Sequence, residues 1–259
     1  MSAIMIFDTE TTSLEKPFCY NIGYTIRDEV TFAELVSREF VVEQVWYNEA
    51  LFASAYYADK RPIYVNRMRG RKIEMRKFGH VMRRMIADIK AFEVVGAYAY
   101  NSGFDEKVFA FNCDWYKCNN PFDAVPIFDI RGYAHHFLCG DVFKGWCEEF
   151  QQFTETGNYS TTAETLFRFV GADLEFIEEH TALSDSMIEA DILRAAIESG
   201  ATLGEDYKAL RSLPRETLKP LTIKIDGRVI FKGEYLTKYE RKNEGLYNFR
   251  TIPKEKQEG

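Results

Sequence analysis

The sequence predicts an α/β fold built on a mixed β-sheet, and three observations lead to this prediction. The chain opens with an unbroken apolar run, and two segments rich in β-branched and aromatic residues follow it. Further along, segments with helical spacing alternate with short apolar runs. Consecutive strands followed by alternating helices and strands are typical of a sheet that holds both antiparallel and parallel pairs. We expect five strands, with helices flanking the sheet.

The first three strands are expected to form an antiparallel meander. Residues 3–8 are apolar up to a terminal acid, which is the pattern of a strand buried on both faces. Residues 18–27 and 32–42 follow as strands, and the polar pair Asp28 and Glu29 marks the turn between them.

Helices and strands alternate in the central part of the chain. The spacing of apolar residues predicts helices at 46–59, 72–92, 105–117, 131–138, 162–170 and 184–199. Apolar runs predict strands at 94–100 and 126–128. Ser184 is the expected N-cap of the last helix, because a serine hydroxyl accepts a hydrogen bond from a free amide of the first turn.

Residues 200–259 differ from residues 1–199 in pattern and charge, so we expect a domain boundary between them. The segment holds 13 Lys and Arg against 9 Asp and Glu, whereas the whole chain has a net charge of −7. Asp226 and Gly227 stand between two apolar runs, and an Asp-Gly pair accepts the positive φ angles of a tight turn. The segment is therefore predicted to be a basic extension that carries a β-hairpin.

Composition indicates where the protein works. The sequence has no run of 18 apolar residues, so we expect no membrane span, and its first residues lack the basic segment of a signal peptide. Its five cysteines are an odd number without a CxxC pair, which indicates reduced thiols. We expect a cytoplasmic protein with no membrane partner.

A basic strip, residues 60–84, stands out within this acidic chain. It carries ten basic side chains and one acid, Glu74. The net charge alone argues against a nucleic-acid partner, but a local strip of cations is suited to phosphate groups. Arg67, Arg69 and Arg71 are the candidate phosphate contacts, and a solvated helix face is the alternative interpretation.

Two carboxylates end the first strand. Asp8 and Glu10 point to the same side, because side chains alternate along an extended strand. Carboxylates a few Å apart repel each other, and one of them stays protonated unless a cation lies between them. Mg²⁺ and Mn²⁺ prefer carboxylate oxygens, so the pair predicts a metal site, with two solvated acids as the alternative.

Two later segments support the metal site. Asp105 follows the strand at 94–100 at a strand-to-helix turn. Asp185 lies in the first turn of the last helix, where the positive end of the helix dipole favours an ionised carboxylate, and His180 precedes it by five residues. Glu189 lies one turn beyond Asp185, and it is interpreted either as a support for the site or as a salt-bridged surface acid.

In this order and spacing, the three acidic segments resemble the motifs of the DEDDh (DnaQ-like) 3′–5′ exonucleases, which have a ribonuclease-H-like fold. The resemblance covers residues 3–199. It departs from the family at Ser13, where many members have glycine. It implies that Asp8, Glu10, Asp105 and Asp185 bind two Mg²⁺ or Mn²⁺ ions and that His180 is the general base. A two-ion site stabilises both the attacking and the leaving oxygen of an in-line displacement at phosphorus.

The resemblance also implies how substrate binds. Leu14 would pack on the terminal base, and the backbone at Thr9 and Thr11 would contact the 3′ end. The predicted reaction removes nucleoside 5′-monophosphates from the 3′ end of single-stranded nucleic acid. DNA is favoured over RNA, although no residue can be assigned to a contact with the 2′-OH. The alternative is a weakly catalytic module for nucleic-acid binding or assembly; a homodimer and a polymerase partner are both compatible with the sequence.

Overall fold

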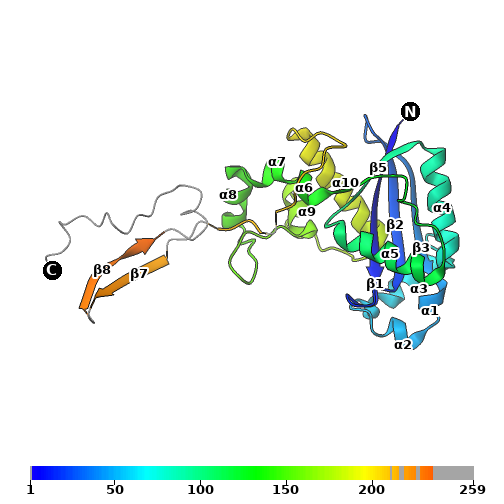
Figure 1. Ribbon diagram of the computed structural model, residues 1–259, viewed down its shortest axis with the longest axis horizontal. Coiled ribbons are helices and arrows are strands. Elements are labelled where there is room, and N and C mark those ends of the chain that lie inside the picture. Colours follow the sequence, from blue (N-terminus) through cyan, green and yellow to red (C-terminus); the bar gives the residue numbers. More distant parts are fainter. Residues whose placement is uncertain (1, 211, 216–218, 226–227, 236–259) are drawn as a thin grey trace.

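A mixed six-stranded sheet forms the centre of the computed structural model, which describes residues 2–210, 212–215, 219–225 and 228–235 (Figure 1). Its strands are β1 (Ala3–Thr11), β2 (Cys19–Asp28), β3 (Glu34–Val42), β4 (Glu74–Arg76), β5 (Val94–Ala99) and β6 (Ile127–Asp129), in the order β4-β3-β2-β1-β5-β6. β2 pairs antiparallel with β1 and β3, and the other pairs are parallel. This arrangement confirms the predicted α/β fold with a mixed sheet. The short edge strand β4 adds a sixth strand to the expected five.

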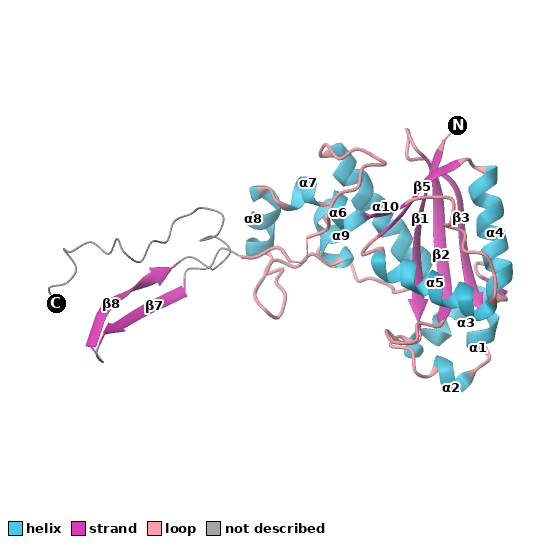
Figure 2. Ribbon diagram, in the orientation of Figure 1, coloured by secondary structure: helices cyan, strands magenta, loops and turns pink. Residues whose placement is uncertain are grey.

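Helices cover both faces of the sheet (Figure 2). They are α1 (Glu43–Trp46), α2 (Glu49–Phe52), α3 (Arg61–Arg69), α4 (Phe78–Ala91), α5 (Gly103–Tyr116), α6 (Ile130–Tyr133), α7 (His135–Leu138), α8 (Asp141–Glu149), α9 (Ala163–Gly171) and α10 (Ala182–Glu198), with a 3₁₀ turn at Ala58–Lys60. Met5 and Phe7 of β1 pack in one core with α4 and α5. Ile4 and Ile6 pack in a second core with α6, α9 and α10. The period of two along β1 therefore assigns its alternate side chains to two different cores.

The helix expected at 46–59 was wrong as a single element. The chain there forms α1, α2 and the 3₁₀ turn, because Asn48 interrupts the helix and caps α2 with its side chain, which accepts a hydrogen bond from the Leu51 amide at 3.1 Å. Helix α3 was not predicted; it carries a proline in its first turn, which is compatible with a helix start.

The helix expected at 72–92 is also shorter than predicted. Its first residues form β4, whose Met75 pairs with Val41 of β3, and Lys77 has an extended backbone before α4 begins. The helix expected at 131–138 is divided into α6 and α7, and α8 was not predicted. α10 begins at Ala182, so Thr181 rather than Ser184 is its N-cap.

The packed body continues beyond residue 199. Ala201 and Leu213 belong to the second core, and Arg215 forms an ion pair with Glu148 of α8 at 2.5 Å. Gly132 of α6 allows the segment around Tyr207 to approach this helix, because a Cβ at Gly132 would lie 2.0 Å from the carbonyl oxygen of Tyr207.

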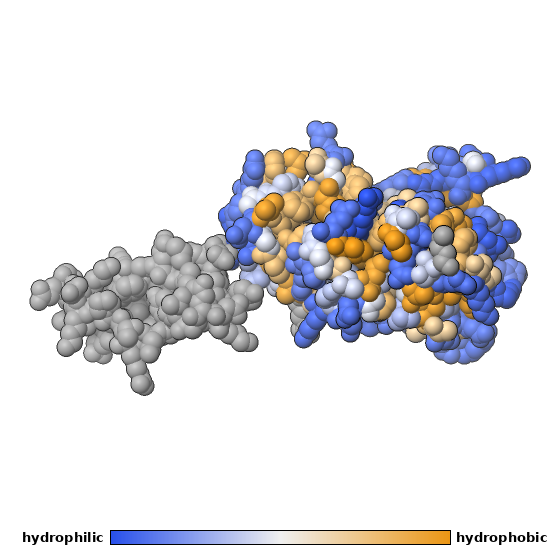
Figure 3. Space-filling view, turned by 90° about the horizontal axis from the view of Figure 1, so that it is seen from above, coloured by the Kyte–Doolittle hydropathy of each residue, from blue (hydrophilic) through white to orange (hydrophobic). Residues whose placement is uncertain are grey.

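On the face of the molecule seen from above, hydrophobic residues show in patches between hydrophilic ones (Figure 3).

The expected C-terminal hairpin forms a separate two-stranded sheet. β7 (Lys219–Ile225) pairs antiparallel with β8 (Arg228–Tyr235), whereas the predicted turn residues Asp226 and Gly227 lie outside the described residues. All five cysteines are free thiols, as expected. Among the described residues, no helix is long and apolar enough to cross a membrane.

Candidate active site

The carboxyl end of β1 places two acids on the same face of the sheet. Asp8 and Glu10 continue the row of Ile4 and Ile6, so they point towards the side covered by α10. Asp8, Glu10 and Asp185 each contribute one carboxylate oxygen, and these three atoms lie within 4.8 Å of one another. The predicted meeting of acids from the first strand and the last long helix is therefore present in the structure.

Close packing between α10 and β2 holds Asp185 near this strand end. A Cβ on Gly23 would lie 2.0 Å from the backbone nitrogen of Leu183, so only glycine allows the helix to approach this closely. Next to it on β2, the Oδ1 atom of Asn21 accepts a hydrogen bond from the Ala182 amide at 2.8 Å. These contacts fix the first turn of α10, which contains Asp185.

Asp105 comes to the same region from the first turn of α5, where it is 3% exposed. The Oγ1 atom of Thr9 donates a hydrogen bond to its Oδ1 atom at 2.6 Å. Burial nevertheless raises the pKa of Asp105 to about 7. Thr9, expected near the 3′ end of a substrate, thus orients an acid of the site with its side chain.

The acids raise one another's pKa values. Burial, followed by the charge of Asp105, holds the pKa of Asp8 well above its usual range. Burial and the charge of Glu178 raise the pKa of Glu10 to about 8 and that of Asp185 to about 9. The structure therefore concentrates more negative charge at this point than the surrounding protein compensates.

A divalent cation fits this donor set. The Oδ1 atom of Asp185 and the Oε2 atom of Glu189 are buried without a hydrogen-bond partner, which is costly for carboxylate oxygens unless a ligand satisfies them. The donors are carboxylate oxygens, which suit Mg²⁺ and Mn²⁺. The acid composition and the unsatisfied oxygens both favour a metal site here.

Glu189 belongs to this acidic group. It is 4% exposed on α10, and burial, followed by the charge of Asp105, holds its pKa well above the usual range. No ion pair of Glu189 is found among the described residues, so its interpretation as a salt-bridged surface acid is wrong. The spacing of one helical turn from Asp185 was the only sequence signal for it.

His180 lies at the rim of the acidic group, in the loop before α10. A ring nitrogen of His180 lies within 4.8 Å of one carboxylate oxygen each of Glu178 and Asp185. The Nδ1 atom of His180 is 3.6 Å from the Oε2 atom of Glu178. Burial and the charge of Lys60 lower the pKa of His180, so the neutral imidazole needed by a general base is favoured. Burial raises the pKa of Glu178 itself to about 7.

The remaining predicted substrate contacts lie in different surroundings. Leu14, in the loop after β1, is 83% exposed, and Thr11 at the end of β1 is half-buried. Arg69 and Arg71 are exposed and make no ion pair within the described part of the chain. Arg67, in contrast, forms ion pairs with Glu39 and Glu179.

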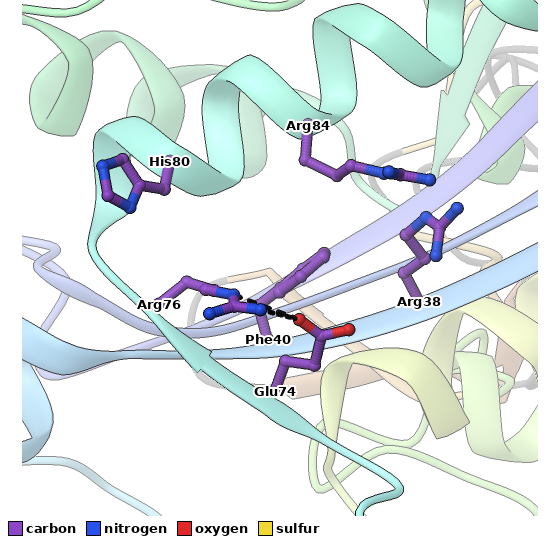
Figure 4. A pocket seen from close by; sticks show the side chains of 6 residues that line it. All are labelled: Arg38, Phe40, Glu74, Arg76, His80 and Arg84. Carbon is purple, nitrogen blue, oxygen red and sulfur yellow. Dashed lines mark hydrogen bonds and ion pairs between the residues drawn. The ribbon is translucent and has the colours of Figure 1, made fainter.

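Other cations of the basic strip lie on the opposite face of the sheet. Six residues line a pocket of about 310 Å³ there, namely Arg38, Phe40, Glu74, Arg76, His80 and Arg84 (Figure 4). Arg38 is in register with Phe7 through Tyr24, so it points away from the face of Asp8. Arg38 and Arg84 share the carboxylate of Asp88, and Arg76 pairs with Glu74. This pocket is thus separate from the acidic group.

Comparisons with known proteins return similar structures only. No family model matches the sequence, and no curated protein matches it. The chain is similar in fold to the nuclease domain of 3′hExo, a DEDDh family member bound to rAMP, with 15% identity and a TM-score of 0.49 over 82% of this chain and 97% of that one.

Two further solved structures are similar. E. coli exonuclease I in complex with a dA16 oligonucleotide has 14% identity and a TM-score of 0.45 over 76% of this chain, which spans only 40% of that protein. A full-length 3′-exonuclease has 16% identity and a TM-score of 0.48 over 82% of this chain and 68% of that one.

Proposed function

We propose that the protein is a metal-dependent 3′–5′ exonuclease that acts on single-stranded nucleic acid, with DNA favoured over RNA. The observation that carries this proposal is the convergence of Asp8, Glu10 and Asp185 within 4.8 Å, with His180 beside Asp185. Acidic groups that bind divalent cations next to a neutral histidine are suited to phosphodiester hydrolysis. The products would be nucleoside 5′-monophosphates.

Asp8, Glu10, Asp105 and Asp185 are the residues that would hold two Mg²⁺ or Mn²⁺ ions. The bound ions would neutralise charge on the scissile phosphate and on the attacking and leaving oxygens. Thr9 keeps Asp105 oriented, and buried Glu189 extends the negative charge around Asp8.

His180 would accept the proton of the attacking water. The lowered pKa of His180 favours the neutral imidazole. The carboxylate of Glu178 lies 3.6 Å from the Nδ1 atom, where it would stabilise the imidazolium that forms when the ring accepts the proton. The water oxygen then bonds to phosphorus, and the bond to the 3′ oxygen of the preceding nucleotide breaks.

Substrate would reach the acids past the loop after β1. The exposed side chain of Leu14 offers an apolar surface for the terminal base, and the backbone near Thr9 and Thr11 lies beside the acids of β1. Arg69 and Arg71 are free to contact phosphates farther along the strand. A homodimer and a polymerase partner stay predictions.

A time course with 5′-labelled substrates tests the proposal. Single-stranded DNA, duplex DNA and RNA are each incubated with Mg²⁺, Mn²⁺ or EDTA and resolved on a denaturing gel. We expect stepwise shortening of single-stranded DNA from the 3′ end with either metal and none in EDTA. Binding of the oligonucleotides without any cleavage would contradict the proposal and favour the alternative of a binding module.

A further inference from the structure

The loop that carries His180 has an unusual backbone. His180 has a φ angle of +55°, in the left-handed region that residues with a side chain seldom adopt. Such a conformation persists when surrounding contacts impose it, and it often occurs at functional sites. Residues 179–181 of this loop contact one segment, residues 57–67, which covers the 3₁₀ turn and most of α3.

Arg67 binds both neighbours of His180. Its Nη1 atom donates to the Oγ1 atom of Thr181 at 3.0 Å, and its Nη2 atom donates to the carboxylate of Glu179. Nη1 also donates to the Oε2 atom of Glu39 at 3.1 Å. Because Glu39 is 4% exposed on β3, the guanidinium connects the loop to a buried anchor in the sheet.

The same segment also contacts the loop backbone and the imidazole. The Nζ atom of Lys60 donates to the carbonyl oxygen of Glu179 at 2.5 Å, and the hydroxyl of Tyr64 donates to the carbonyl oxygen of His180 at 3.5 Å. The ring of Tyr57 stacks on the imidazole at 4.3 Å with an angle of 13° between the planes. The segment therefore restrains both the backbone and the ring of His180.

We infer that Arg67 is a positioning residue that acts through His180, rather than a phosphate contact. This inference rests on the proposed function, because Arg67 would position His180, the proposed general base. The three acceptors of Arg67 all belong to the protein, and its side chain is 24% exposed. Loss of the guanidinium leaves Glu39 buried without its cation and frees the loop.

Steady-state kinetics separate a positioning residue from a phosphate contact. For Arg67→Ala we expect kcat to fall roughly 100-fold with little change in KM, because small misplacements of a catalytic group have losses of this order. Arg67→Lys retains the charge without the planar fork, so it restores only part of kcat. Arg69→Ala is the comparator for a phosphate contact and raises KM instead. Arg83, an exposed arginine of α4, is the control, and Arg83→Ala leaves both constants unchanged.

A double variant tests whether Arg67 acts through His180. If it does, Arg67→Ala costs little further activity once His180→Ala is present, so the two losses are not additive. Additive losses, or an effect of Arg67→Ala confined to KM, would overturn the inference. Arg67→Lys keeps a cation beside buried Glu39, so it supplies the same test if Arg67→Ala folds poorly.

Hydrogen exchange gives a readout that does not depend on activity. In Arg67→Ala we expect faster exchange of the amides at 178–182, with the amides of α4 unchanged, whereas Arg83→Ala matches the wild type. Unchanged exchange at 178–182 would overturn the inference. Absence of cleavage by the wild-type protein would instead contradict the proposed function and leave this exchange test intact.

Discussion

Removing one acid from the site is expected to stabilise the metal-free protein while abolishing its activity. Asp185 is a suitable residue, because its Oδ1 atom has no hydrogen-bond partner, and burial together with the neighbouring carboxylates raises its pKa to about 9. Asp185→Asn keeps the shape of the side chain and removes its charge. We therefore expect a higher melting temperature in EDTA at pH 8 and no cleavage with Mg²⁺.

The sign and size of the effect follow from the pKa values. A carboxyl group whose pKa is raised by folding destabilises the folded state as pH rises from its unfolded pKa, near 4, to its folded pKa. At pH 8 the carboxyl group of Asp185, with a pKa of about 9 in the folded protein, should therefore cost on the order of 5 kcal/mol, given about 1.4 kcal/mol per pKa unit; Glu10, with a pKa of about 8, adds to this cost. Metal-free stability therefore falls between about pH 4 and pH 9.

Thermal unfolding at pH 5, 6, 7 and 8, with EDTA or with Mg²⁺, measures the effect. In the wild-type protein we expect the melting temperature in EDTA to fall as pH rises, and Mg²⁺ to restore about 3 kcal/mol at a concentration 100 times its Kd. Asp185→Asn should lose both the pH dependence due to this group and most of the metal response. Glu155→Gln, at an exposed position, is the matched control. A flat pH profile in EDTA, or an Asp185→Asn protein less stable than the wild type at pH 8, would refute the reasoning.

Four further predictions concern single elements of the site. His180→Ala should lose most of its turnover, roughly 10²-fold or more, yet bind Mg²⁺ as the wild type does in calorimetry. Because the pKa of His180 is lowered, the wild-type rate should level off at a lower pH than it would with a histidine of ordinary pKa. Glu189→Gln should raise metal-free stability at pH 8, since it removes a buried charge near Asp105, and a loss of stability would contradict this. Arg69→Ala with Arg71→Ala should weaken binding of single-stranded oligonucleotides and lower the slope of log K against log salt by about 1.4 units, equally for different base sequences. Gly23→Ala should destabilise the protein by more than about 3 kcal/mol in urea unfolding, because its Cβ would overlap the backbone of Leu183.

The strands were predictable because their pattern is local. The apolar run of β1 and the β-branched segments of β2 and β3 read as strands whatever they pack against. The broken helix before α3 was not predictable in this way, since the interruption at Asn48 depends on one capping side chain. β4 was missed because three residues on an edge strand carry too little periodicity to be distinguished from the start of a helix.

The acids proposed for the site could be predicted from the sequence for a similar reason. Each of Asp8, Asp105 and Asp185 lies at the end of a strand or the start of a helix, so its place follows from the element that carries it. The support of His180 does not follow in this way, because Arg67 and Lys60 are more than 100 residues from the loop they hold. The basic strip predicts phosphate contacts from the sequence, whereas the fold turns one of its arginines, Arg67, towards the carboxylates of Glu39 and Glu179. Charge pairing between distant segments has no local signature, so sequence alone could not separate Arg67 from Arg69 and Arg71.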